Sequence, residues 1–151
     1  ISVLKHFKNQ LESCEIDVLG DIDIYFGIRN KLHDYLYEKE LNELMAYFKE
    51  QHPDGKYNIY LGQSRPGKIT LIILDGDEKM TYVQERMREN EDDLEYKLEV
   101  KKAIVYIWGN GLTMVKGVED VLKDILGEEF GLKRLVEQNR YKKEVWLTAQ
   151  V

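Results

Sequence analysis

Acidic and lysine side chains are spaced along the middle of the chain as they would be for phosphodiester chemistry. Carboxylate oxygens are the ligands that Mg²⁺ prefers, and a nearby lysine can polarise the attacked phosphate or the attacking water. An aspartate follows a proline, an acidic cluster comes further along, and an acidic residue precedes a lysine by two positions at Asp77-Glu78-Lys79 and again at Glu95-Tyr96-Lys97. The hypothetical catalytic set is Asp54, Asp75, Asp77, Lys79 and Lys97, with Mg²⁺ as its cofactor.

This arrangement resembles that of the PD-(D/E)xK nucleases, and the resemblance implies a metal-dependent nuclease or phosphodiesterase. The pattern can be completed through Lys79 or through Lys97, and Asp75-Gly76-Asp77 is also typical of a hairpin turn. The net charge of −6 disfavours broad binding of nucleic acid. We therefore interpret these residues as turn and solvated-strand positions, expect no catalytic or metal-binding residue, and keep the nuclease as the alternative.

Aromatic residues form the second candidate surface. The chain has ten tyrosines and two tryptophans, and many lie on segments that we predict to be strands. They cannot all fit on the covered face of a small sheet, and tyrosine and tryptophan are enriched at interfaces. The candidate partner-binding residues are Tyr82, Tyr96, Tyr106, Trp108 and Trp146.

The leading hypothesis is accordingly a non-enzymatic binding or regulatory domain that acts through an aromatic-rich sheet face or edge. An immunity or anti-defence protein is one version of it. We expect a protein partner, with a homodimer as one form, and neither a cofactor nor a nucleic-acid partner. A small-ligand-sensing domain, with a tyrosine-lined pocket between sheet and helices, is a further alternative.

Two strand patterns lie head to tail at the predicted centre of the fold. Apolar and charged residues alternate from Leu94 to Lys101, which is typical of a half-buried strand. Every position from Ala103 to Trp108 is apolar, which favours a strand covered on both faces. Asn110-Gly111 is a favourable two-residue hairpin turn, so Leu112–Val115 is predicted as the returning strand.

Apolar spacing of three and four residues predicts the helices. The strongest predicted helix runs from Ile28 to Gln51, with a kink or a second helix as an alternative near residues 38–40. The segment Asp21–Ile28 fits either a strand or an extension of this helix, and we favour a helix that begins at about Asp21. The other expected helices are Val3–Leu11, Val118–Leu126 and Phe130–Val136, and the other expected strands are Tyr57–Leu61, Lys68–Leu74, Lys79–Glu85 and Val145–Ala149, with a charged loop at Arg86–Asp93.

Length and composition indicate one globular domain over residues 1–151. The expected fold class is α+β, with a largely antiparallel five- or six-stranded sheet covered by the long N-terminal helix and a C-terminal helix. The single cysteine, Cys14, excludes a disulfide framework within the chain. Because no apolar run approaches the roughly 18–20 residues that span a bilayer, we expect a soluble, cytoplasmic protein without a membrane partner.

Overall fold

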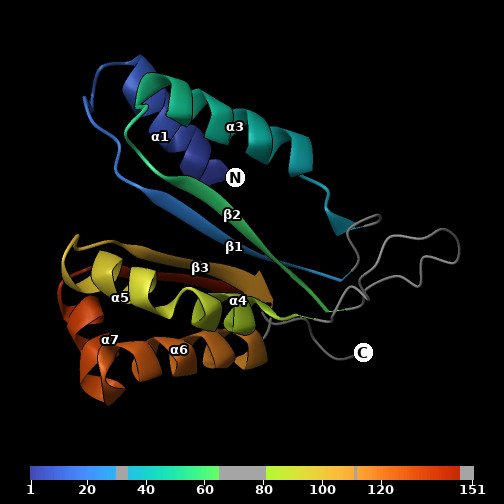
Figure 1. Cartoon of the computed structure of the whole chain (residues 1–151), viewed down its shortest axis with the longest axis vertical. Helices are drawn as coiled ribbons and strands as arrows, with labels where there is room; N and C mark the ends of the chain where they lie inside the picture. Colours follow the sequence, from blue (N-terminus) through green and yellow to red (C-terminus); the bar gives the residue numbers. More distant parts are fainter. Residues whose placement is uncertain (30–33, 65–80, 111, 147–151) are drawn as a thin grey trace, which may run out of the picture. The chain divides into compact units, whose positions relative to one another are not determined.

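A computed structural model describes residues 1–29, 34–64, 81–110 and 112–146. The chain divides into two compact units, Ile1–Tyr82 and Val83–Val151. Each unit is built from helices and a pair of parallel strands (Figure 1). The first contains α1 (Ser2–Glu12), β1 (Ile22–Ile28), α3 (Glu38–Gln51) and β2 (Tyr57–Gln63), and the second contains α4 (Val83–Glu89), α5 (Glu91–Glu99), β3 (Val105–Asn110), α6 (Leu112–Leu126), α7 (Glu128–Glu137) and β4 (Tyr141–Trp146).

In the first unit, β1 and β2 pair in parallel register from Ile22 opposite Tyr57 to Ile28 opposite Gln63. Parallel strands need a crossover between them, and α3 provides it here. Helix α3 packs against α1 and β2. Its apolar positions recur at helical spacing and form a buried cluster with Leu4 of α1, namely Leu41, Leu44, Met45 and Phe48.

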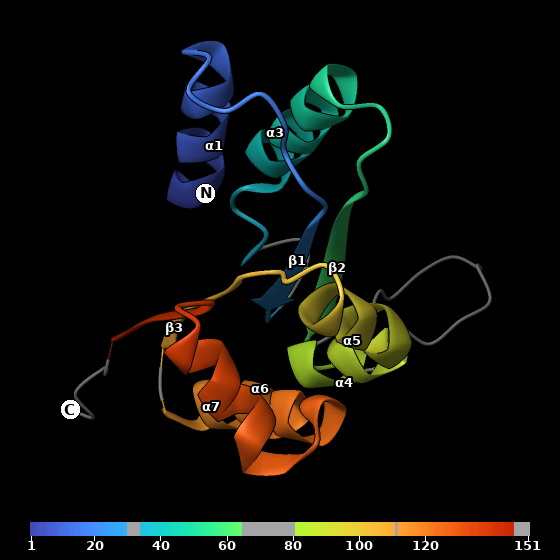
Figure 2. The ribbon, with the colours of Figure 1, turned by 90° about the vertical axis from the view of Figure 1, so that its left-hand side faces the viewer.

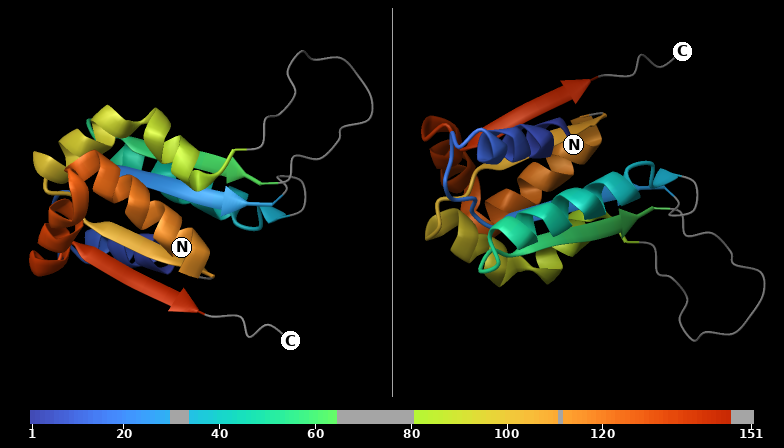
Figure 3. Two further views of the ribbon diagram at one scale, coloured as in Figure 1. Left: turned by 90° about the horizontal axis from the view of Figure 1, so that it is seen from below. Right: turned by 90° about the horizontal axis from the view of Figure 1, so that it is seen from above.

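In the second unit, β3 and β4 also pair in parallel, from Val105 opposite Tyr141 to Asn110 opposite Trp146. The two arrows point the same way in Figure 3. Helix α6 contacts β3, α4, α5 and α7, so it is the central helix of this unit (Figure 2). Helix α7 packs closely against the end of α6 at a glycine, because a Cβ on Gly131 of α7 would lie 2.8 Å from the carbonyl oxygen of Leu126.

A buried arginine joins three segments of the second unit. Arg140 is 8% exposed. Its Nη1 donates hydrogen bonds to the carbonyl oxygens of Leu98, at 2.8 Å, and Ala103, at 3.0 Å, and its Nε donates to Gln138 Oε1 at 2.9 Å. Arg140 therefore ties the end of α5 and the approach to β3 to the start of β4.

A second polar cluster joins β4 to α6. Tyr141 Oη donates a 2.5 Å hydrogen bond to Glu119 Oε1, and Lys143 Nζ donates one of 3.0 Å to the same oxygen. Burial acts to raise the pKa of the Glu119 carboxyl, but the hydrogen bonds from Tyr141 and Lys143, with the charges of Lys143 and Lys123, outweigh it and hold that pKa below its ordinary value of 4.5. Burial, followed by the hydrogen bond and charge of Glu119, raises the pKa of the Tyr141 hydroxyl.

The predicted antiparallel five- or six-stranded sheet is wrong, because the described strands form two parallel pairs. The error arises at Asn110-Gly111, which reads as a hairpin turn. Strand β3 instead ends at Asn110 and α6 begins at Leu112, so the expected returning strand is the first turn of a helix. A fully apolar run such as Ala103–Trp108 fits a parallel strand with a helical crossover just as well.

The strand predicted from Leu94 to Lys101 is also wrong, because α5 occupies most of it. The apolar and charged residues of this segment alternate, but the buried positions are spaced as in a helix: Leu94, Lys97 and Leu98. The sequence pattern misses this face because Lys97 is charged. Likewise, the charged residues 86–93 belong to α4 and α5 rather than to a loop, and Val83–Glu85 begins α4 instead of ending a strand.

The long helix expected from Asp21 or Ile28 is shorter at its start. Residues Ile22–Ile28 form β1, the strand alternative that we did not favour, and α3 begins at Glu38, where the kink was expected. The expected end near His52–Gly55, strand β2 and the helices α1, α6 and α7 are confirmed. The expected strand at Lys68–Leu74 lies outside the described residues, and the last strand is β4, Tyr141–Trp146.

We expect replacement of Arg140 to destabilise the chain strongly. Arg140→Ala leaves the carbonyl groups of Leu98 and Ala103 without this donor, which should lower the free energy of unfolding by about 2–4 kcal/mol. The matched control is Arg134→Ala, which removes an exposed ion pair with Glu99 and should cost at most about 1 kcal/mol. Urea unfolding followed by circular dichroism measures both, and equal costs would contradict the role given to Arg140.

Acid should weaken the cluster around Glu119. A carboxyl whose pKa is lowered by folding adds stability above its unfolded pKa, and this stability is lost as pH falls through the folded pKa. We therefore expect the stability difference between the wild type and Glu119→Gln to be largest near neutral pH and to shrink as the pH falls to about 3. Glu43→Gln, in the exposed pair with Lys39, is the control and should show a small, nearly constant difference. Urea midpoints across this range test the expectation, and a difference that grows on acidification would overturn it.

Candidate functional site

The carboxyl ends of β1 and β2 form the first candidate site. Because the strands are parallel and in register, Ile28 and Gln63 end them side by side. The backbone N–H of Ser64 donates a 3.0 Å hydrogen bond to the carbonyl oxygen of Ile28, and the Ser64 hydroxyl lies 3.4 Å from the same oxygen. Arg29 follows β1 directly and its side chain is exposed. In open α/β sheets, ligands bind outside the carboxyl ends of the strands.

The chain returns to this edge before α4. Thr81 forms an isolated antiparallel bridge with Gln63, and its N–H donates to the Gln63 carbonyl oxygen at 3.0 Å. Thr81 is buried, whereas Tyr82 beside it is 48% exposed. This edge therefore holds the guanidinium of Arg29, the hydroxyl of Ser64 and the phenol of Tyr82. Arginine forms bidentate hydrogen bonds with phosphate, and hydroxyls can donate to phosphate oxygens, so this set suits a phosphorylated ligand.

The carboxyl end of β3 forms the second candidate site. Tyr106 and Trp108 stack with ring centroids 5.4 Å apart and planes only 4° from parallel. Glu144, the register partner of Trp108 on β4, accepts a 3.1 Å hydrogen bond from the indole Nε1. Both rings are partly exposed, at 36% and 41%. We call Tyr106 and Trp108 the aromatic stack.

A helix starts immediately beyond the aromatic stack. Helix α6 begins at Leu112, and its first turn contains no acidic residue. The strand passes close to this helix, because a Cβ on Gly109 would overlap the methyl group of Met114. A helix amino terminus favours anionic groups through its dipole and its unpaired N–H groups. This end of β3 is therefore electrostatically compatible with a phosphorylated ligand as well.

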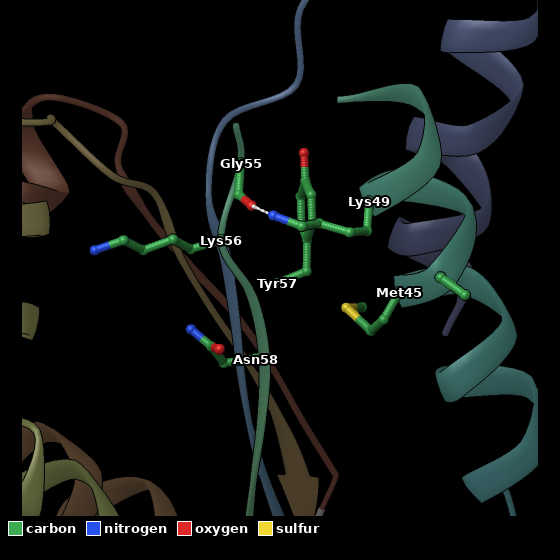
Figure 4. Close-up of a pocket in the computed structure, with 7 residues that line it drawn as sticks. Met45, Lys49, Gly55, Lys56, Tyr57 and Asn58 are labelled. Carbon is green, nitrogen blue, oxygen red and sulfur yellow. Dashed lines mark hydrogen bonds between the residues drawn. The ribbon is translucent and has the colours of Figure 1, made fainter. Parts of the chain in front are cut away.

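A shallow hollow of about 430 Å³ lies at the other end of β2, beside α3 (Figure 4). Met45 and Lys49 line it from the helix, and Lys56, Tyr57 and Asn58 from the strand. The Lys49 ammonium donates hydrogen bonds to the carbonyl oxygens of Pro53 and Gly55. Because Lys49 already binds the turn that leads into β2, we interpret the hollow as part of the packing between α3 and β2 and not as a ligand site.

The two described members of the hypothetical catalytic set, Asp54 and Lys97, belong to different units of the chain. Asp75, Asp77 and Lys79 lie outside the described residues. Asp54 lies in the turn after α3, in the first unit. Lys97 is buried on α5, in the second unit, and its Nζ lies 2.7 Å from Asp93 Oδ2. In the parts that the structure describes, no three histidine, cysteine, aspartate or glutamate side chains gather to hold a metal ion.

The five aromatic candidates lie in different surroundings. Tyr106 and Trp108 stack on β3, and Tyr82 lies beside the end of β2. Tyr96 is exposed on α5, where a strand was expected. Trp146 ends β4, and its side chain lies outside the described part of the chain. That the five contact a protein partner stays a prediction.

Sequence reasoning missed Arg29 and Ser64 as site residues. Each stands just after a seven-residue segment rich in isoleucine and aromatic residues. Because residues 21–28 were interpreted as a helix, the strand that ends just before Arg29 was not predicted. Ser64 was assigned to a hairpin turn, so it was not considered as a site residue. Two strand ends joined by a helical crossover would have placed these side chains at one edge.

No known family model matches the chain. Individual proteins do: it is 34% identical to NADPH–cytochrome P450 reductase of Phanerodontia chrysosporium over 137 residues and 28% identical to the protein of the same name from Salmo trutta over 138 residues. It is also 25% identical to human methionine synthase reductase over 157 aligned positions. These matches cover 84%, 85% and 97% of the chain but only 17%, 20% and 21% of the relatives, so the chain spans about a fifth of their length.

These relatives overturn the functional expectations. They are reductases, so the leading hypothesis of a non-enzymatic binding domain is wrong, and so are its two alternatives, the nuclease and the ligand sensor. The expectation that no cofactor is needed is wrong too, because several of the relatives are named for NADPH. Within the described residues, no helix is long and apolar enough to cross a membrane. Over most of its length, then, the chain is similar to one segment of NADPH-dependent reductases.

Proposed function

We propose that this chain is the nucleotide-handling part of an NADPH-dependent reductase. One observation carries the proposal: the similarity to such enzymes extends over 84% or more of the chain, rather than over one short motif. Most of the chain is therefore similar to part of a reductase from Salmo trutta and to part of one from Phanerodontia chrysosporium. Its own geometry supports a nucleotide rather than a protein as the primary ligand.

The support from geometry is the arrangement of parallel strands. Dinucleotides bind at the carboxyl ends of parallel strands because loops and helix starts collect there and expose backbone N–H groups. Arg29 and Ser64 stand at this edge of the first unit. Arg29 is exposed and makes no hydrogen bond or ion pair with the described part of the chain. Its guanidinium has the charge and the planar donor geometry that a phosphate of the nucleotide requires.

The chemistry then divides between the chain and its cofactors. NADPH, when bound, supplies a hydride. A flavin, when bound to another part of the reductase, would supply the redox chemistry between the dinucleotide and an acceptor protein. The relatives are named for cytochrome P450 and for methionine synthase. In this proposal the chain binds and orients the nucleotide, and other parts of the reductase hold the flavin. A protein partner on the acceptor side fits the partner expected from the sequence.

Several predictions from the sequence accompany this proposal. The single domain over residues 1–151, the homodimer and the cytoplasmic location stay predictions. So does the contact of the exposed aromatic residues with a partner. For an electron-transfer protein, that partner would be the acceptor, whose surface must approach closely for electrons to pass.

Direct binding of the nucleotide tests the proposed function. Isothermal titration calorimetry of the 151-residue chain should show NADPH binding with a single site, and 2′,5′-ADP should compete for it. NADH lacks the 2′-phosphate, so it should bind more weakly by about tenfold or more, because a charge-assisted phosphate contact contributes on the order of 1.5–3 kcal/mol. Absence of heat with either dinucleotide, confirmed by equilibrium dialysis, would contradict the proposal.

Replacement of Arg29 tests the assigned edge. Arg29→Ala should raise the Kd for NADPH by roughly 5- to 30-fold, which corresponds to a loss of about 1–2 kcal/mol. Arg29→Lys should recover part of the loss because it keeps the charge but not the bidentate geometry. Lys133→Ala removes an exposed cation in the last turns of α7, in the other unit, and is the control. If Arg29→Ala binds NADPH as the wild type does, the nucleotide lies elsewhere.

A further inference from the structure

The aromatic stack has a carboxylate on its indole nitrogen. Tyr106 and Trp108 are two positions apart on β3, so their side chains leave the same face of the strand. Their ring centroids lie 5.4 Å apart, with 4° between the ring planes. Glu144 Oε2 accepts a 3.1 Å hydrogen bond from the indole Nε1. All three residues come from β3 and β4, whose register brings them together on regular strands rather than on loops.

These three groups have complementary redox properties. Indole and phenol are the aromatic side chains that lose a single electron most readily, and loss of an electron makes the indole N–H strongly acidic. The proton then needs a base, and the carboxylate of Glu144 already lies on that nitrogen. Its negative charge also stabilises the positive charge that oxidation creates on the ring. Close parallel contact with Tyr106 allows an electron to pass from the phenol to the oxidised indole without a covalent link.

The aromatic stack is also accessible from solvent. Tyr106 is 36% exposed and Trp108 is 41% exposed. A small diffusing oxidant can therefore reach the rings, and the proton that an oxidised Tyr106 releases can pass to water. Another stacked pair, Tyr25 with Tyr60, lies in the first unit and contains no indole. An accessible indole, a stacked phenol and a proton acceptor are the parts of a one-electron relay.

We propose that Trp108, Tyr106 and Glu144 form a radical relay that carries an oxidising equivalent from the indole to the phenol. A one-electron oxidant, such as an oxygen-centred radical, takes an electron from Trp108, and the Nε1 proton moves to Glu144. An electron then passes from Tyr106 to the indolyl radical, Glu144 returns the proton to Nε1, and the Tyr106 hydroxyl releases its proton to water. The oxidant is thereby reduced, Trp108 and Glu144 are restored, and the phenoxyl radical on Tyr106 takes one electron and one proton from a soluble enediol such as ascorbate.

This relay goes beyond the proposed function, because neither NADPH nor a flavin takes part in it. Its use follows from the class of enzyme to which the relatives belong, since electrons that escape from a reductase to oxygen generate oxygen radicals beside the protein. An indole that passes its radical to a phenol is restored instead of being degraded. The test needs no nucleotide, so the relay and the proposed function can fail separately.

Pulse radiolysis of the full chain with azidyl radicals tests the relay, because this oxidant removes an electron from indole in preference to phenol near neutral pH. The chain has two tryptophans, so Trp146→Phe leaves Trp108 as the single indole and is the reference form. In it, the absorption of the indolyl radical should convert into that of a phenoxyl radical at a rate that does not depend on protein concentration. Adding Tyr106→Phe keeps a ring on the indole but removes the hydroxyl, so this conversion should be lost.

Two further variants, each made in the reference form, complete the test. Tyr96→Phe removes the hydroxyl of a tyrosine on α5 that is 49% exposed, and it should leave the conversion unchanged. Glu144→Gln can still accept the hydrogen bond from the indole but cannot take its proton. The protonated radical cation, which absorbs at longer wavelength than the neutral indolyl radical, should therefore persist longer in Glu144→Gln.

Each outcome supports or overturns a part of the relay. A reference form that yields no phenoxyl radical overturns it, and so does Tyr106→Phe converting at the reference rate, because another tyrosine is then the acceptor. A radical cation of unaltered lifetime in Glu144→Gln overturns the proton transfer to Glu144. Circular dichroism checks the fold of every variant. If Trp146→Phe is unfolded, comparison of the wild type with Trp108→Phe isolates the signal of Trp108 instead.

Discussion

The parallel pairing of strands is the constraint on which the rest of this structure depends. Two parallel strands cannot be joined by a tight turn, so β1 and β2 are connected through α3, and β3 and β4 through α6 and α7. Each connection brings an amphipathic helix against the strands it joins. The same constraint gathers the carboxyl ends of paired strands at one edge, which is where Arg29 and Ser64, and separately Trp108 and Glu144, come together.

Local periodicity in the sequence predicts most helices but not the way in which the strands pair. Helix α3 and helix α6 follow from apolar residues at spacings of three and four, and β3 follows from its unbroken apolar run. Asn110-Gly111 illustrates the failure. The dipeptide favours a tight turn, but whether the next segment returns as a strand depends on packing against α4, α5 and α7, which lies beyond any local pattern.

Helix α5 shows a different limit. Its buried face includes Lys97, whose ammonium pairs with Asp93 one turn earlier while its stem packs inside. A charged residue on the buried face makes the apolar residues alternate as they would in a strand. The candidate site could be predicted only in part for a different reason: Trp108 is conspicuous by residue type, whereas Arg29 and Ser64 are identified only once their strands are known to pair.

The near-parallel rings of Tyr106 and Trp108 have a consequence for how this protein can be observed. Two chromophores at a centroid separation of 5.4 Å share their electronic excitations, so their near-ultraviolet circular dichroism is a property of the couple and not of either ring. Their coupled band reports on the alignment of β3, beside the contribution of the stacked Tyr25 and Tyr60 rings in the first unit. No external label is needed to follow that strand during unfolding or as ligands arrive.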